Sequence, residues 1–359
     1  MIERFVPVLA LFAGMTFSQA AALQTPDYTD HFRVFTGDGE AASLEDIVRA
    51  MAHVDAVLVG EIHTDPVGHW IEAELFRRAL AMVGAGEEAG AVRSVALSLE
   101  MFERDVQGIV DEYLKDLITE DQFKASARPW EYYDSDYRPM VEMAKASGVA
   151  VLAANAPRRY VNRVSRMGPG ALNDLSSQAR STLPPLPYPP PTDAYRAEWN
   201  ALMTGMVMEQ QCPVPEEAGG EKEEIQEEEE TPGGHPTQEP PHGPPAGMPT
   251  HGGSFMENGL QAQTLWDASM AHAITTFLEM NPGSLVLHMV GGFHVENSTG
   301  TPEKVQFYRP GTRSLVVHMD IAADFTAFDP DEHAGRGDFV ILTDKSLDLN
   351  YERNCTDQG

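Results

Sequence analysis

The sequence predicts an α/β protein: a mostly parallel sheet covered by helices on both faces, with a helical subregion and a disordered acidic insertion. Short apolar runs of strand length alternate along the chain with longer segments in which apolar residues recur at helical spacing. The runs are apolar at nearly every position, which is typical of parallel strands buried on both faces. At 359 residues, the chain is long enough for one large domain with a substantial core.

The elements can be placed in order along the chain. Residues 31–36 and 44–51 predict a strand and a helix that precede the core of the sheet. Strands are expected at the apolar runs 56–59, 93–99, 149–154, 285–290, 315–319 and 339–342. Helical spacing occurs at 70–80, within 104–147, and at 160–167, 193–211, 259–279 and 301–307. The proline-rich residues 183–191 predict an extended connector, because proline fixes φ and lacks an amide donor.

The first twenty residues have the layout of a secretory signal peptide. A charged start at residues 1–4 is followed by the apolar run 5–17 and then by Ser18-Gln19-Ala20, which has the small residues of a cleavage site. We therefore expect cleavage near Ala20 and a periplasmic or secreted mature protein. An uncleaved N-terminal anchor is the alternative.

Residues 213–253 interrupt the single domain expected for residues 21–359. They are rich in Glu, Pro, Gly and His and nearly lack apolar side chains, so burial cannot offset the entropy of ordering them. We predict a disordered insertion that serves as a solvated tether or binds metal weakly through its histidines. Cys212 and Cys355 permit one disulfide in an oxidising compartment. The formal net charge of −30 argues against nucleic acid as a partner, because phosphate binding needs clustered Lys and Arg.

Polar side chains directly follow four of the predicted strands. They are Glu61 with His63, Glu100, Asn155 and His294. Because ligands bind at the carboxyl ends of strands in parallel α/β sheets, we expect these side chains to line one pocket. Glu61, His63, Glu100 and His294 offer two carboxylates and two imidazoles, a set able to bind a divalent transition metal or to activate water. Alternatively, Glu61 and His63 cap the next helix or pair with each other in a polar core.

Other candidate residues lie on the segments that follow these strands. His69 begins a helix and faces either the pocket or solvent. Residues 130–139 are dense in aromatic and acidic side chains, and Tyr133, Tyr137 and Arg138 within them either contact a flat apolar ligand or cover the core.

The later segments add four more candidates. Arg158 either pairs with ligand carboxylates or lies on a helix surface. Gln263 and Asp267 are four residues apart on one helix face and could orient a histidine from behind. Met270 is expected to pack in the core.

These motifs, taken in order, resemble the ChaN-like haem-binding uptake family, whose relatives include the Tiki and erythromycin-esterase group. The resemblance covers residues 45 to 320, with the insertion as its one interruption. Its motifs are Gly60-Glu61-Ile62-His63, Glu100-Met101-Phe102, Asn155-Ala156-Pro157-Arg158, the Gln263, Asp267, Met270 and Ala271 pattern, and Gly291-Gly292-Phe293-His294.

The resemblance implies an exported protein that binds haem for haem or iron uptake. It also allows a homodimer and contacts with uptake machinery at the cell envelope. The residues implied to contact haem are His63, His69, Tyr133, Tyr137, Arg138, Asn155, Arg158, Gln263, Asp267 and His294. The alternative is a hydrolase that requires a divalent transition metal, in which Glu61, His63, Glu100 and His294 activate water. The absence of a Gly-x-Ser-x-Gly motif argues against a serine hydrolase.

Overall fold

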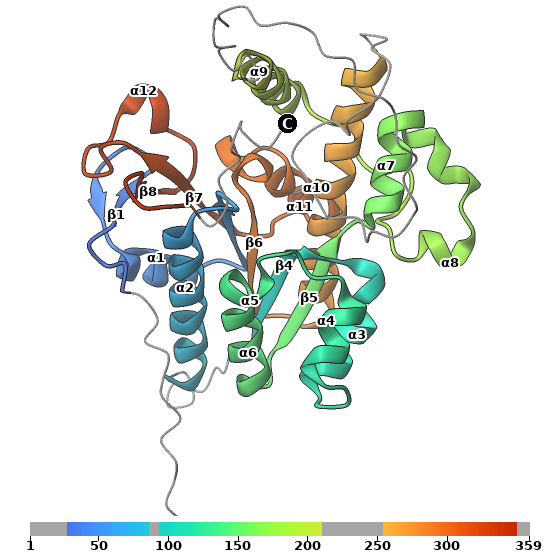
Figure 1. The fold of residues 1–359 in the computed structure, drawn as a ribbon, viewed down its shortest axis with the longest axis horizontal. Coiled ribbons are helices and arrows are strands. Elements are labelled where there is room, and N and C mark those ends of the chain that lie inside the picture. The colour runs from blue at the N-terminus through green and yellow to red at the C-terminus, as the bar shows by residue number, and fades with distance from the viewer. Residues whose placement is uncertain (1–26, 86–92, 210–253, 350–359) are drawn as a thin grey trace, which may run out of the picture.

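The computed structural model describes residues 27–85, 93–209 and 254–349 (Figure 1). The predicted signal peptide, the predicted insertion and both cysteines lie outside these residues. In the described part of the chain, no helix has the length and apolar character needed to cross a membrane.

Eight strands of the described residues form one sheet, in the order β2-β1-β8-β7-β3-β6-β4-β5. The strands from β3 to β8 run parallel to one another, whereas β1 pairs antiparallel with β2 and β8. Their bounds are β1 (Phe32–Thr36), β2 (Ala41–Ala42), β3 (Ala56–Glu61), β4 (Val95–Glu103), β5 (Ala150–Asn155), β6 (Leu285–Gly291), β7 (Ser314–Ala322) and β8 (Phe339–Asp344). The mostly parallel sheet predicted from the sequence is confirmed.

The α-helices of the described residues lie in the segments between the strands. They are α1 (Leu44–Met51), α2 (Pro66–Ala85), α3 (Gln107–Leu114), α4 (Glu120–Ala127), α5 (Tyr133–Asp136), α6 (Arg138–Ser147), α7 (Arg158–Met167), α8 (Ser177–Arg180), α9 (Asp193–Glu209), α10 (Ser254–Met280), α11 (Thr301–Tyr308) and α12 (Pro330–His333). Short 3-10 helices are η2 (Arg104–Val106), η3 (Pro169–Asp174), η4 (Gly292–His294) and η5 (Glu296–Ser298).

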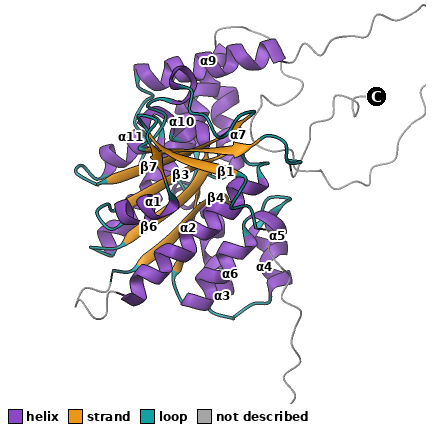
Figure 2. Ribbon diagram, turned by 90° about the vertical axis from the view of Figure 1, so that its left-hand side faces the viewer, coloured by secondary structure: helices purple, strands orange, loops and turns teal. Residues whose placement is uncertain are grey.

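Helices cover both faces of the sheet, as predicted (Figure 2). Buried side chains of α1 to α6 pack with Val57 and Val59 on one face, and those of α7, α10 and α11 pack with Ala56 and Leu58 on the other. This division follows from the pleat, because successive residues of a strand point to opposite faces. We call the face covered by α1 to α6 the α2 face, and the face covered by α7, α10 and α11 the α10 face.

Strand β4 continues to Glu103, beyond the end at Leu99 that the apolar run predicts. The register of its pairing with β5 shifts between Leu99 and Glu103, because extra residues on β4 oppose the end of β5. Met101 and Phe102 both join the core on the α2 face. The strand therefore carries Glu100 within its length rather than after its end.

Candidate functional site

Two of the predicted strand-end residues, Glu61 and Glu100, lie beside the end of β6. In the parallel pairing of β3 with β6, Glu61 is the partner of Gly291. The amide of Gly291 donates a hydrogen bond of 2.8 Å to Oε2 of Glu100 on the other neighbouring strand. Glu61 and Glu100 therefore flank the same residue from opposite sides.

The four predicted metal or catalytic residues form two groups rather than one continuous set. Glu61 and His63 contact each other on the α2 face, and Glu61 also contacts His69 of α2 and Tyr137, which lies between α5 and α6. Glu100 and His294 contact each other and are linked to α10. The reason is the pleat of the strands, which directs Glu61 and Glu100 to different faces.

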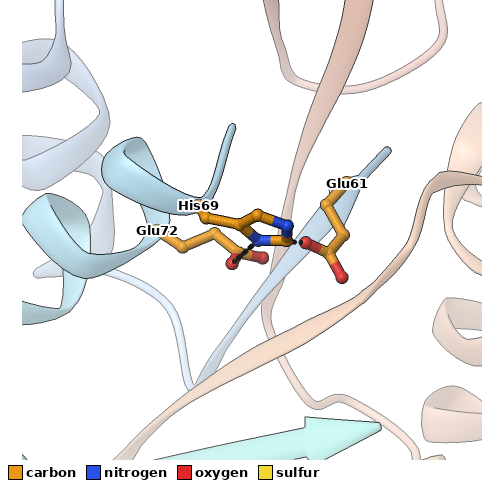
Figure 3. Close-up of side chains that lie close together, drawn as sticks. All are labelled: Glu61, His69 and Glu72. Carbon is orange, nitrogen blue, oxygen red and sulfur yellow. Dashed lines mark hydrogen bonds and ion pairs between the residues drawn. The ribbon is translucent and has the colours of Figure 1, made fainter. Parts of the chain in front are cut away.

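The Glu61 group is a buried network around one carboxylate. Nδ1 of His63 lies 2.7 Å from Oε1 of Glu61, and the hydroxyl of Tyr137 donates to the same oxygen at 2.8 Å. Nδ1 of His69 lies 2.9 Å from Oε2 of Glu61 and 3.3 Å from Oε2 of Glu72 (Figure 3). Glu61 therefore orients two imidazoles, one through each of its oxygens.

The charges in this group depend on one another. Burial alone would raise the pKa of Glu61, but His69 and His63 more than offset it and hold that pKa below its usual value. Burial would lower the pKa of His69, but Glu61 and Glu72 raise it well above its usual value. Burial, followed by the charge of Glu61, raises the pKa of Glu72 to about 8. The arrangement favours one ionised carboxylate, one imidazolium and one protonated carboxyl near neutral pH.

His69 faces the buried interior rather than solvent, which decides between the two orientations that its sequence position allows. Its Nε2 lies 3.1 Å from the carbonyl oxygen of His63 and 3.4 Å from Oδ2 of Asp136. Glu72 and Asp136 were not identified from the sequence. The spacing of His69 and Glu72 on one helix would have been the available signal for Glu72, because residues three apart share a helix face.

The His294 group, formed by His294 and Glu100, contacts α10 through Asp267. Nδ1 of His294 is 2.8 Å from Oδ1 of Asp267, and its Nε2 is 3.9 Å from Oε1 of Glu100. Thr301 donates to the same Asp267 oxygen at 3.0 Å. Although burial would lower the pKa of His294, Asp267 and then Glu100 raise it. Asp267 therefore occupies the position expected for a residue that orients a histidine from behind.

Aromatic side chains surround the His294 group. The rings of Trp266 and Phe293 lie 6.2 Å and 5.9 Å from that of His294, measured between centroids. Tyr195 and Trp199 of α9 contact Phe293 in turn. His294 is fully buried, so a large ligand can reach its imidazole only if this aromatic cover moves.

Of the predicted residues in the 130–139 segment, Tyr137 lies in the Glu61 group, whereas Tyr133 and Arg138 contact other helices of the α2 face. Tyr137 contacts Glu61, whereas Tyr133 packs against Phe102 and Phe123. Arg138 forms an ion pair with Glu120, away from the Glu61 group. Trp130 lies 4.9 Å from the ring of His63, edge to face, which places one aromatic of the segment beside the site.

The later candidates lie around the α10 face. Asn155 is buried and its side chain accepts from the amide of Ala156, while Arg158 is half-buried at the start of α7. Gln263 is buried one turn before Asp267, and its Oε1 has no hydrogen-bond partner among the described residues. Met270 is fully buried in the core, as expected.

The two candidate histidines share one chemical feature. A carboxylate holds Nδ1 of each, Glu61 for His63 and Asp267 for His294. This contact is typical of histidines that bind a metal or transfer a proton through Nε2, because it fixes the tautomer and the orientation of the ring. In His69, Nδ1 contacts Glu61 and Nε2 contacts the carbonyl oxygen of His63.

Comparisons with protein-family models and with solved structures both give a match to ChaN. A family model described as haem-binding uptake, Tiki superfamily, ChaN matches residues 47–305. Among solved structures, the chain is similar to ChaN of Campylobacter jejuni, described with cofacial haem binding. The identity is 16% and the TM-score 0.58, and the match covers 88% of this chain and 98% of that one.

Two further structures match more distantly. The type III effector HopBA1 has 12% identity and a TM-score of 0.40, with 84% of this chain and 93% of that chain covered. A mutant of the erythromycin esterase EreC in its open conformation has 9% identity and a TM-score of 0.36, with 87% and 82% covered. No curated protein matches the chain.

Proposed function

Because the chain belongs to the ChaN haem-binding uptake family of the Tiki superfamily, we propose that it binds haem or a related iron porphyrin for uptake. The observation that carries the proposal is the orientation of His63. Its Nδ1 is held by Glu61, and its side chain is 13% exposed beside Trp130. An imidazole at the edge of a buried network, with an indole next to it, suits an iron porphyrin, whose iron accepts an axial imidazole and whose ring is flat and apolar.

The chain's own residues have distinct tasks in this proposal. His63 would hold the iron through Nε2, and Glu61 would keep the ring in place through Nδ1. Tyr137 supports Glu61 through its hydroxyl. Arg158, which is half-buried, can pair with a propionate as Arg commonly does with carboxylates.

Haem titration of the purified protein tests the proposal. We expect saturable binding with a shift of the Soret band, and loss of that shift in His63→Ala. The matched control His53→Ala removes an exposed imidazole and should titrate as wild type does. The absence of saturable binding to wild type would refute the proposal.

A second candidate function is a metal-dependent hydrolase, favoured by the alignment of Asp267, His294 and Glu100. A base oriented by a third group is the arrangement that activates a nucleophile, here water. The predicted set of Glu61, His63, Glu100 and His294 would then share the task. If the protein does not bind haem but hydrolyses esters or peptides only after addition of a divalent metal, the hydrolase replaces haem binding.

We also propose export to the periplasm or medium, with cleavage of the signal peptide near Ala20. Intact-mass measurement on protein from the native envelope is the test, and a retained Met1 would contradict cleavage. A homodimer that holds haem would appear as an increase in size on addition of haem during gel filtration. Contacts with uptake machinery would appear as co-purification of envelope proteins after cross-linking.

A further inference from the structure

The Glu61 group contains more buried acid than the haem proposal uses. Glu61, Glu72 and Asp136 are each at most 3% exposed, and each lies within 3.4 Å of a nitrogen of His69. Glu61 also contacts the imidazole of His63. Among the described residues, neither Glu61 nor Glu72 forms an ion pair with an arginine or lysine. A buried excess of carboxyl groups is costly unless a proton or a cation accompanies it.

Two of the three donor–donor distances match those around a small metal ion, and the third, between the two carboxylates, is at most 4.8 Å. Nδ1 of His69 lies 2.9 Å from Oε2 of Glu61 and 3.3 Å from Oε2 of Glu72. One donor from each of the three residues can be chosen so that all lie within 4.8 Å of one another. Donors at about 2.0–2.2 Å from one cation are about 2.8–3.6 Å apart in octahedral or tetrahedral geometry. Figure 3 shows the two carboxylates meeting at the same imidazole.

The surroundings of these donors also match those of a metal site. Nε2 of His69 lies 3.1 Å from the carbonyl oxygen of His63, a contact that leaves Nδ1 as the ligand atom. Tyr137 donates to the other oxygen of Glu61 and so fixes this carboxylate. Glu72 is fully buried, and its Oε1 has no hydrogen-bond partner among the described residues. An unsatisfied buried carboxyl oxygen beside an imidazole and a second carboxylate is explained if it serves as a ligand.

We propose that Glu61, His69 and Glu72 bind one divalent cation of the first transition series. One imidazole nitrogen and carboxylate oxygens suit Mn²⁺, Fe²⁺, Co²⁺ or Zn²⁺. The site differs from the set predicted from the sequence, because it takes His69 and Glu72 from α2 in place of His63, Glu100 and His294. It does not require haem. Glu61 would connect the two sites, because its Oε1 contacts His63.

Binding of Co²⁺ to the full-length, haem-free protein tests the proposal. The apo protein is prepared with a chelator under mildly denaturing conditions and refolded with Co²⁺, because the buried site admits a cation slowly. Equilibrium dialysis gives the affinity, and the visible absorption of Co²⁺ reports its ligands. We expect one tightly bound equivalent in wild type.

Two variants on the same helix make the test specific. Glu72→Gln keeps the shape but removes a ligand charge, so it should weaken Co²⁺ binding by more than about tenfold and change the absorption spectrum. Even residues that only orient ligands alter metal affinity by about 10- to 100-fold. Glu74→Gln removes a carboxylate that pairs with Arg77 and Arg78, and should bind as wild type does. Circular dichroism verifies that both variants are folded.

Two results would overturn the proposal. One is equal affinity and an equal spectrum in Glu72→Gln and wild type, which would assign the cation elsewhere, for example to histidines of residues 213–253. The other is the absence of a bound equivalent in refolded wild type. Because haem is absent throughout, the outcome is independent of the haem titration.

Discussion

Two buried histidines on the α10 face should make the stability of the protein strongly dependent on pH. His288 lies 2.9 Å from the hydroxyl of Ser98, and Nδ1 of His318 has no hydrogen-bond partner among the described residues. The pKa of each is lowered from the usual 6.5 to about 3, mainly by burial, and the charge of Arg336 contributes to the lowering for His318. Both imidazoles are therefore neutral in the folded protein and protonate only when it unfolds in mild acid.

The sign and size of the effect follow from this difference. Well above pH 6.5 the histidines are neutral in both states, so the folded state keeps its full stability. Between pH 6.5 and 3 the unfolded chain binds the extra protons, and stability falls as the pH falls. At pH 4.5, two pH units below the usual pKa, each histidine should cost about 2.7 kcal/mol at about 1.36 kcal/mol per unit.

Urea denaturation of wild type and His318→Leu at pH 7.5 and pH 4.5 measures this effect. The leucine changes packing, but that change is the same at both pH values and cancels in the comparison. We expect wild type to lose about 2.7 kcal/mol more than the variant between the two pH values. The control His53→Leu removes an exposed imidazole and should lose as much as wild type. Equal losses in wild type and His318→Leu would refute the reasoning.

Three further predictions concern the site and the insertion. Tyr137→Phe removes the hydrogen bond to Glu61 and should destabilise the protein by about 1.5–3 kcal/mol in urea denaturation. Tyr133→Phe, which removes a buried hydroxyl that has no hydrogen-bond partner among the described residues, should cost less, and the reverse order would contradict the network. His63→Ala and His294→Ala should each weaken haem binding. If both histidines act on one ligand, their effects on the binding free energy should be non-additive in the double variant. Wild-type haem affinity in both single variants would exclude the strand-end site. Replacing residues 213–253 with a short Gly-Ser loop should change the free energy of unfolding by less than about 0.5 kcal/mol, and a large loss would mean that these residues pack.

The sequence was sufficient to place the central strands and the longer helices because their patterns are local, whereas the short elements β2, α8 and α12 were not predicted. The apolar run 56–59 and the polar residues after it identify β3 and its end without knowledge of the rest of the chain. The antiparallel pairing of β1 with β8 was not predicted, because it joins residues 32–36 to 339–343, and no short-range pattern specifies a partner so distant.

The burial of polar side chains was the second feature that could not be predicted from the sequence. Glu72 follows Ile71 on a helix whose apolar residues already define its buried face, and a glutamate there is usually exposed. Its burial depends on contacts with Glu61 and His69, which exist only after β3 and α2 have packed. The same holds for Tyr137, whose hydroxyl meets Glu61 across 76 positions of sequence.

The division of the predicted set into two groups follows from strand register. Val286 of β6 is the partner of both Ala56 and Ala96, and all three belong to the core on the α10 face. Glu61 lies an odd number of positions beyond Ala56 and so points to the α2 face, whereas Glu100 lies an even number beyond Ala96 and points to the α10 face. A shift of one residue in either pairing would move a carboxylate to the other face. A ligand that contacts both groups must therefore lie across the end of β6, where Gly291 separates the two carboxylates.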